Sequence, residues 1–215
     1  MRPVTMTLVL INVLVYVWEV ATGTNFDDTN SLIAHGGLNA QLFYEGQWWR
    51  IVTAGFLHAG LAHIALNMFA LYQLGTFVEA VLGSWRTLAI YSFSLAVAGY
   101  AVVLFPPDGN LAIPTVGASG AIFGLFGALI AIGLRLGKRG RSLIMQTLPI
   151  LVINLVFTFA VPFISKAGHV GGLLSGFVAG FILFSMKPRA AAPVVVDTST
   201  GEPAEAELLP PQTPA

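Results

Sequence analysis

Long apolar runs, separated by short polar connections, are the main pattern of the sequence. A helix needs about 20 mostly apolar residues to cross the hydrocarbon core of a bilayer. Six stretches meet this length, at roughly 4–22, 61–82, 87–105, 116–134, 143–164 and 168–186. The pattern therefore predicts an all-α membrane protein, a bundle of six transmembrane helices.

The segments between and after these runs differ in character. The first connection, at about 23–60, mixes charged, aromatic and histidine residues and is too varied for a disordered linker. The stretch after Lys187 is rich in Pro, Ala, Glu and Thr and cannot bury a core. We expect a membrane domain over 1–187 and a disordered cytoplasmic tail over 188–215. No small-x-small cleavage site follows the first run, so we expect that run to be retained as a helix.

The basic residues predict the direction of the helices, because cytoplasmic loops of membrane proteins are enriched in Lys and Arg. With a cytoplasmic N-terminus, only Arg50 and Lys166 face outward, and the other basic residues all lie inside. The reverse topology would invert this bias. Both termini are therefore predicted to be cytoplasmic, and the runs at 61–82, 116–134 and 168–186 begin at the external surface.

Composition narrows the possible functions. The chain has 215 residues, of which 56% are hydrophobic and 9% charged, whereas soluble domains carry about 25% charged residues. Lipid is therefore the expected environment, and the zero formal net charge argues against a nucleic-acid partner. The chain contains no cysteine, which excludes disulfides and thiolate chemistry.

Polar residues recur at one depth, near the external start of three of the predicted helices. The second helix and its lead-in carry His58, His63 and Asn67, the fourth helix carries Ser119, and the sixth carries His169. Polar groups inside a span are costly, so they are candidates for function. His63 and Asn67 are four residues apart and share one helix face.

Small residues border the serine and the histidine at helical spacing. Stripes of this kind allow close packing of membrane helices. They consist of Gly120, Gly124 and Ala128 beside the serine, and of Gly172, Gly176 and Gly180 beside the histidine. A nucleophile and its base must approach within about 3 Å, which these two stripes would permit.

Each of these residues also has a plainer interpretation. Ser119 alone could bond back to its own helix, and His63 with Asn67 could join two helices. His58 and His35 lie in or near the outer loop, where a solvated histidine is the default. The combination of nucleophile, base and separate donor pair is what favours acyl-transfer chemistry.

Other chemistries fit the sequence less well. Ala121 breaks the Gly-x-Ser-x-Gly pattern of soluble hydrolases, and His58 and His63 do not form the HExxH zinc signature. We therefore predict no metal and no cofactor. No aspartate lies inside a span, which argues against an aspartyl intramembrane protease. Ser175 is a rival nucleophile, but it lies roughly 9 Å deeper than His169 along the same helix.

Four segments together resemble the rhomboid proteases over residues from about 49 to 180. They are Trp49-Arg50, HAGLAHIALNM at 58–68, GASGAIFG at 117–124, and GHVGGLLSG at 168–176.

The resemblance implies a six-helix fold and assigns roles to these residues. Ser119 and His169 would form a catalytic dyad, and the Ser119 amide with the His63 and Asn67 side chains would hold the oxyanion. The same motifs mark a supporting set, namely Gly117, Gly120, Phe123, His58, Trp49, Arg50, Gly172 and Gly176.

The resemblance has more specific implications for three of these positions and for one further residue, Glu79. Trp49 and Arg50 would belong to the first-loop structure, and Glu79 would have a structural role. Phe123 replaces a Tyr found in some members, and its ring can still stack on the histidine.

The resulting hypothesis is an intramembrane serine endopeptidase that cuts other membrane proteins in or beside their transmembrane segments. Its partners would be such substrates and membrane lipids, and its site would open to the external side of a bacterial inner membrane. One alternative is a catalytically inactive rhomboid-like protein that binds membrane proteins. Another is a small transporter, which should show a polar path across the whole bilayer, whereas polarity here is confined mainly to the outer third.

Overall fold

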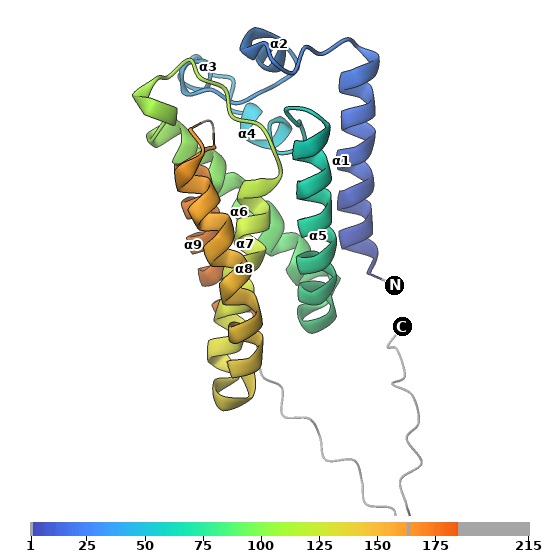
Figure 1. Ribbon diagram of the computed structural model, residues 1–215, viewed down its shortest axis with the longest axis vertical. Helices are drawn as coiled ribbons and strands as arrows, with labels where there is room; N and C mark the ends of the chain where they lie inside the picture. The colour runs from blue at the N-terminus through green and yellow to red at the C-terminus, as the bar shows by residue number, and fades with distance from the viewer. Residues whose placement is uncertain (1, 163, 185–215) are drawn as a thin grey trace, which may run out of the picture. The chain divides into compact units, whose positions relative to one another are not determined.

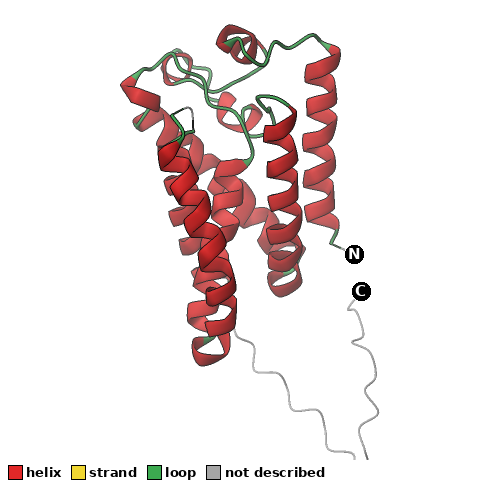
Figure 2. Ribbon diagram, viewed as in Figure 1, coloured by secondary structure: helices red, strands yellow, loops and turns green. Residues whose placement is uncertain are grey.

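Each apolar run of the sequence folds into one long helix. The computed structural model describes residues 2–162 and 164–184, and that part of the chain consists of helices and loops (Figure 2). The long helices are α1 (Pro3–Ala21), α5 (Leu61–Leu82), α6 (Ser84–Leu104), α7 (Ser119–Arg135), α8 (Arg141–Ala160) and α9 (Lys166–Leu183). The first connection forms three short helices, α2 (Thr29–Ala34), α3 (Ala40–Tyr44) and α4 (Arg50–Thr53). Two 3-10 turns, η1 (Pro107–Gly109) and η2 (Gly137–Gly140), follow α6 and α7.

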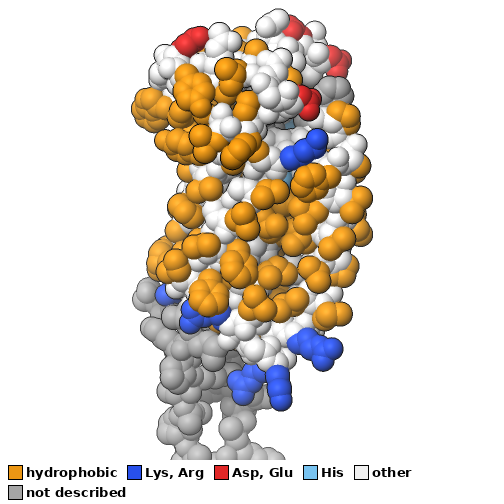
Figure 3. Space-filling model, turned by 90° about the vertical axis from the view of Figure 1, so that its left-hand side faces the viewer, with side chains coloured by type: hydrophobic (Ala, Val, Ile, Leu, Met, Phe, Trp, Pro, Cys, Tyr) orange, Lys and Arg blue, Asp and Glu red, His pale blue; other side chains and the backbone are white. Residues whose placement is uncertain are grey.

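The helices have the apolar surface that a bilayer requires. Within the described residues, five helices are long and apolar enough to cross a membrane, namely α1, α5, α6, α8 and α9, with α6 and α8 extended by the adjoining turns. A broad apolar band covers the face seen in Figure 3, with acidic side chains at one end, most basic ones at the other, and one basic side chain near the acidic end. This confirms an all-α protein suited to a membrane. The predicted tail at 188–215 and the domain boundary at 187 lie outside the described residues.

Helix α7 is the centre of the bundle. It packs most extensively on α9 and also contacts α6, α8 and α5 (Figure 1). The residues from Gly120 to Leu129 are all buried. It has 17 residues, fewer than the five longer apolar helices. Other helices therefore surround α7, and the larger apolar side chains exposed on the bundle come mainly from its neighbours.

Helix α7 begins three residues later than the predicted start at 116. Thr115 pairs with Leu38 through two backbone hydrogen bonds of 2.7 and 3.1 Å, and the Gly117 N–H donates to the Ala54 carbonyl at 2.8 Å. Gly117 has φ +122°, a conformation that only glycine adopts readily. These ties to the first connection hold the segment in an extended form, so the helix begins at Ser119. Figure 1 shows this segment descending into the bundle before α7 starts.

Arg50 holds the first connection together. Its guanidinium Nη1 donates to the carbonyls of Ile33 and Gly37 at 2.7 and 2.9 Å, and Nε donates to Gln47 Oε1 at 2.7 Å. The same group lies over the ring of Trp49, 4.6 Å from its centroid. Arg50 is buried and Trp49 is exposed. The segment is therefore an ordered cap, in agreement with the prediction that it is not a disordered linker.

Glu79 attaches α1 to the rest of the bundle. One carboxylate oxygen accepts from the Thr5 N–H and hydroxyl at 2.9 and 2.7 Å. The other accepts from the Val4 N–H at 3.0 Å and the Ser84 hydroxyl at 2.7 Å. The amides of the first helical turn lack intrahelical partners and sit at the positive end of the helix dipole. The buried carboxylate of α5 therefore caps the N-terminus of α1.

We predict that Glu79→Gln detaches α1 in part, because the amide carries no charge and offers only one acceptor oxygen. The free energy of unfolding in detergent should fall by about 1.5–3 kcal/mol, the usual range for a hydrogen bond to a charged group. The exposed Glu45 provides a control, because Glu45→Gln should leave the unfolding transition unchanged. Equal stability of the parent and the Glu79 variant would contradict the capping role.

Candidate active site

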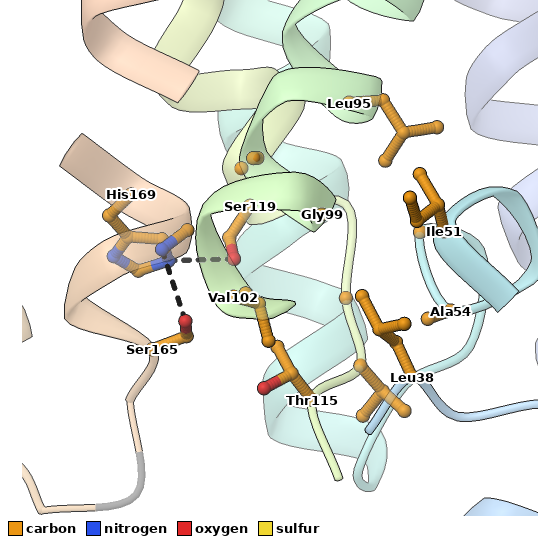
Figure 4. A pocket seen from close by; sticks show the side chains of 16 residues that line it. Leu38, Ile51, Ala54, Leu95, Gly99, Val102, Thr115, Ser119, Ser165 and His169 are labelled. Carbon is orange, nitrogen blue, oxygen red and sulfur yellow. Dashed lines mark hydrogen bonds between the residues drawn. The ribbon is translucent and has the colours of Figure 1, made fainter. Parts of the chain in front are cut away.

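Ser119 and His169 meet where α7 and α9 begin. The distance between Ser119 Oγ and His169 Nε2 is 2.7 Å, a hydrogen bond between residues 50 positions apart (Figure 4). Ser119 is the first residue of α7, and His169 lies in the first turn of α9. A serine hydroxyl hydrogen-bonded to an imidazole is the arrangement by which proteins activate a nucleophile.

Glycines bring the two helices close enough for this contact. A Cβ atom added at Gly172 would overlap the backbone of Gly120, and one added at Gly176 would overlap the backbone of Gly124. At Gly180 the added atom would lie 2.6 Å from the Ala128 Cα. Any larger residue at these positions would push α9 away from α7. The two stripes of small residues therefore face each other, as the sequence pattern indicated.

The His169 ring is held at three places. The Phe123 ring stacks on it with centroids 4.2 Å apart and planes 16° apart. Nδ1 lies 2.8 Å from the Thr158 hydroxyl oxygen of α8, and Nε2 contacts Ser119. His169 as a whole is 8% exposed. Phe123 thus packs on the histidine as expected, without a phenol hydroxyl.

His63 and Asn67 lie next to the segment that leads into Ser119. A Cβ atom added at Gly117 would sit 2.8 Å from His63 Nε2 and 3.7 Å from Asn67 Nδ2. The Ala59 N–H donates to His63 Nδ1 at 3.2 Å. Because Nδ1 accepts this bond, the proton of a neutral His63 is on Nε2, the nitrogen that faces Gly117. His63 therefore presents a hydrogen-bond donor toward Gly117, two residues before Ser119.

His58 supports His63 from within the protein. Its side chain is fully buried, so the alternative of a solvated loop histidine is wrong. Its backbone N–H donates to the buried Glu19 carboxylate of α1 at 3.1 Å. The rings of His58 and His63 meet edge to face with centroids 5.2 Å apart. Burial, with a smaller effect of the nearby His63, lowers the pKa of His58 to about 3, so this imidazole stays neutral.

A small cavity lies beside Ser119, between the first connection and α6. Its volume is about 40 Å³, which exceeds the roughly 10–15 Å³ that one water molecule needs. Most of its lining is apolar (Figure 4) and includes Leu38, Ile51, Leu95, Gly99 and Val102, and its polar side chains are Ser119, His169, Thr115 and Ser165. The serine thus has free space on one side, walled by α4 and α6.

Two other candidates from the sequence lie outside this arrangement. Arg50 donates to loop carbonyls rather than to Ser119 or His169, so its role is to shape the cap. The Ser175 hydroxyl donates to the Gly172 carbonyl of its own helix at 2.9 Å. Its hydrogen is thereby committed within α9, which weakens Ser175 as a rival nucleophile.

Two polar residues of this region, Thr158 and Glu19, were not predicted from the sequence. Thr158 lies near the end of an apolar run, where threonine is common and carries little signal. Glu19 is a carboxylate inside the first apolar run, a rare feature in a span and therefore a usable signal. Its partner is a backbone amide of the second run's lead-in, which no spacing rule in the sequence indicates.

Comparison with known proteins now identifies the family. The Rhomboid domain matches residues 45–186, about two thirds of the chain. The chain belongs to the rhomboid family. It is 41% identical over 157 residues to the rhomboid protease GluP of Bacillus subtilis, and 32% identical over 145 residues to the putative rhomboid protease YdcA of the same species. It is also 29% identical over 215 residues to the rhomboid protease AarA of Providencia stuartii.

These rhomboid relatives differ in how much of their length is matched. The alignments cover 73%, 67% and 87% of this chain, respectively. They cover 30% of GluP, 71% of YdcA and 75% of AarA. Family membership and the apolar helices together make the chain an integral, multi-pass membrane protein.

Proposed function

We propose that this rhomboid-family protein is an intramembrane serine endopeptidase with Ser119 as nucleophile and His169 as general base. The observation that carries the proposal is the 2.7 Å contact between Ser119 Oγ and His169 Nε2. The substrates are other membrane proteins, cut at peptide bonds in or beside their transmembrane segments. No metal or cofactor takes part in the proposed reaction.

The reaction proceeds through an acyl-enzyme. His169 Nε2 takes the Ser119 proton as Oγ attacks the scissile carbonyl, and a tetrahedral intermediate forms. The C–N bond then breaks, and His169 returns its proton to the leaving amine. A water molecule, deprotonated by the same nitrogen, attacks the ester and releases the carboxylic acid and free Ser119.

The oxyanion of each intermediate is held by three donors, namely the Ser119 N–H, His63 Nε2–H and the Asn67 amide. The Ser119 amide belongs to the first turn of α7, where amides lack intrahelical partners and the helix dipole favours negative charge. The proximity of His63 Nε2 and Asn67 Nδ2 to Gly117 supports the other two assignments. Losing one such donor typically lowers the rate about 100- to 1,000-fold.

Substrate preference follows from the shielding of peptide bonds in a helix. A segment must unwind before Ser119 can attack it, so substrates should carry small or helix-breaking residues near the cut. The cavity of about 40 Å³ beside Ser119 leaves room for water or a small side chain. Bulky groups would not enter it without displacing α4 or α6.

The proposed topology adds α7 as a sixth span, with both termini cytoplasmic. At 1.5 Å per residue, 17 helical residues extend roughly 25 Å, and the extended segment before Ser119 makes up the remaining depth. The turn between α7 and α8 carries Arg135, Lys138, Arg139 and Arg141. It lies at the end opposite α2, α3 and α4 (Figure 1). The positive-inside rule places that turn in the cytoplasm, so the Ser119 site opens externally, as in a bacterial inner membrane.

Cleavage of a transmembrane substrate in proteoliposomes tests the proposed activity. The parent protein should cut a substrate whose transmembrane segment carries small residues, and Ser119→Ala and His169→Ala should each abolish the cut. Ser175→Ala is the matched control and should cleave at the parent rate, because its hydroxyl is occupied within α9. No cleavage by the parent would favour the inactive alternative, and unchanged cleavage by Ser119→Ala would refute the nucleophile.

Reporter fusions test the six-span topology separately. A fusion after Arg139 and another after Ala190 should report a cytoplasmic location, and a fusion at Asp108 should report an external one. With only five crossings, the fusions after Arg139 and Ala190 would not both be cytoplasmic. An external signal at Arg139 would contradict the proposed topology, because α7 would then either fail to cross the membrane or cross it in the opposite direction.

A further inference from the structure

The proposed reaction uses only one nitrogen of His169, yet the other nitrogen also has a partner. Nδ1 lies 2.8 Å from the Thr158 hydroxyl oxygen, and Thr158 is 1% exposed. Thr158 belongs to α8, two residues before its end, so this contact joins α8 to α9. A buried hydroxyl aimed at the base of a candidate site requires an explanation.

The hydroxyl can play only one role toward the imidazole. Thr158 Oγ1 also lies 2.7 Å from the Asn154 carbonyl, one turn earlier in α8. A carbonyl oxygen only accepts, so the single hydroxyl hydrogen of Thr158 is donated to Asn154. The Thr158 oxygen must then accept, and the donor is the Nδ1–H of His169.

We propose that Thr158 is a positioning residue that selects the Nδ1-protonated tautomer of His169, an inference that rests on the proposed function. A neutral imidazole carries one proton, and the hydrogen bond of one nitrogen sets the state of the other. With the proton on Nδ1, Nε2 keeps its lone pair directed at Ser119 Oγ. The opposite tautomer would turn an N–H toward the serine and could not accept its proton.

Thr158 also limits the movement of the ring. Ser119 restrains Nε2, Thr158 restrains Nδ1, and Phe123 restrains one face. Threonine is stiff at χ1 because it is β-branched, and its bond to the Asn154 carbonyl adds to that stiffness. The ring is therefore pre-oriented before a substrate arrives.

A hydroxyl suits this position better than a carboxylate. Soluble serine proteases place an aspartate behind the histidine, but burying an unpaired carboxylate in an apolar bundle costs several kcal/mol. A threonine hydroxyl accepts the same hydrogen bond without bringing a charge. It selects the tautomer, although it stabilises the imidazolium that forms during the reaction less than an aspartate would.

Kinetics of three variants test the positioning role. Thr158→Val keeps the shape and removes the acceptor, and kcat should fall roughly 10- to 100-fold, the range expected when a buried donor loses its partner. KM should change little, because the hydroxyl does not touch substrate. Thr158→Ser restores the acceptor and should return kcat to within a few fold of the parent value. Thr147→Val is the control, a buried threonine of α8 eleven residues away, and should behave as the parent.

The ¹⁵N spectrum of labelled His169 in detergent tests the tautomer without relying on activity. The parent should show a protonated Nδ1 and an unprotonated Nε2 at neutral pH. Thr158→Val should shift His169 toward a mixture of tautomers, and Thr158→Ser should not. If Thr158→Val does not fold, the spectrum of the parent and the kcat of Thr158→Ser remain decisive.

Three results would overturn the inference. They are a parent His169 protonated on Nε2, a Thr158→Val enzyme with the parent kcat, and a Thr158→Ser enzyme as impaired as the valine variant. Failure of the proposed function is distinguishable, since the parent would then show no Ser119-dependent cleavage while the spectrum still reported the tautomer.

Discussion

The backbone contact between α7 and α9 is the constraint on which the site depends. Gly172 and Gly176 of α9 lie so close to the backbone of Gly120 and Gly124 of α7 that neither α9 position can hold a side chain. Apolar side chains gain little by leaving lipid for another helix, so close packing must hold the pair together. This contact sets the separation of Ser119 and His169 at hydrogen-bond distance. Glycine at positions 172 and 176 is thus a geometric requirement of the proposed chemistry as well as of the fold.

The two histidines at the site are assigned opposite tautomers by neutral partners. The Ala59 amide donates to His63 Nδ1, which leaves His63 Nε2–H as a donor. In the proposed arrangement the Thr158 hydroxyl accepts from His169 Nδ1, which leaves His169 Nε2 as an acceptor for the Ser119 proton. Neither histidine has a charged group as this partner. Burying a charged partner beside either ring would cost its free energy of hydration. The network therefore provides a donor for the proposed oxyanion and an acceptor for the serine proton without a carboxylate.

The sequence predicted the features that depend on composition and helical spacing. It did not predict the features that depend on the path of the loops. The apolar runs located the long helices. Ser119 and His169 became candidates because polar residues recur at one depth in three of these helices. The late start of α7 was missed, because Thr115 pairs with Leu38, some 80 residues earlier in the chain. Burial of His58 was missed for the same reason, since its partner Glu19 lies on another helix. Thr158 was missed because only the three-dimensional placement of α8 distinguishes it from other threonines.

The central claim is that Ser119 is chemically activated by His169, and active-site labelling measures this most directly. A fluorophosphonate probe, added to the detergent-solubilised protein without substrate, should attach to Ser119 when the modified peptide is mapped by mass spectrometry. The label should be lost in His169→Ala, because a serine hydroxyl without its base is a weak nucleophile. Labelling of another serine, or equal labelling of Ser119 without His169, would contradict the account.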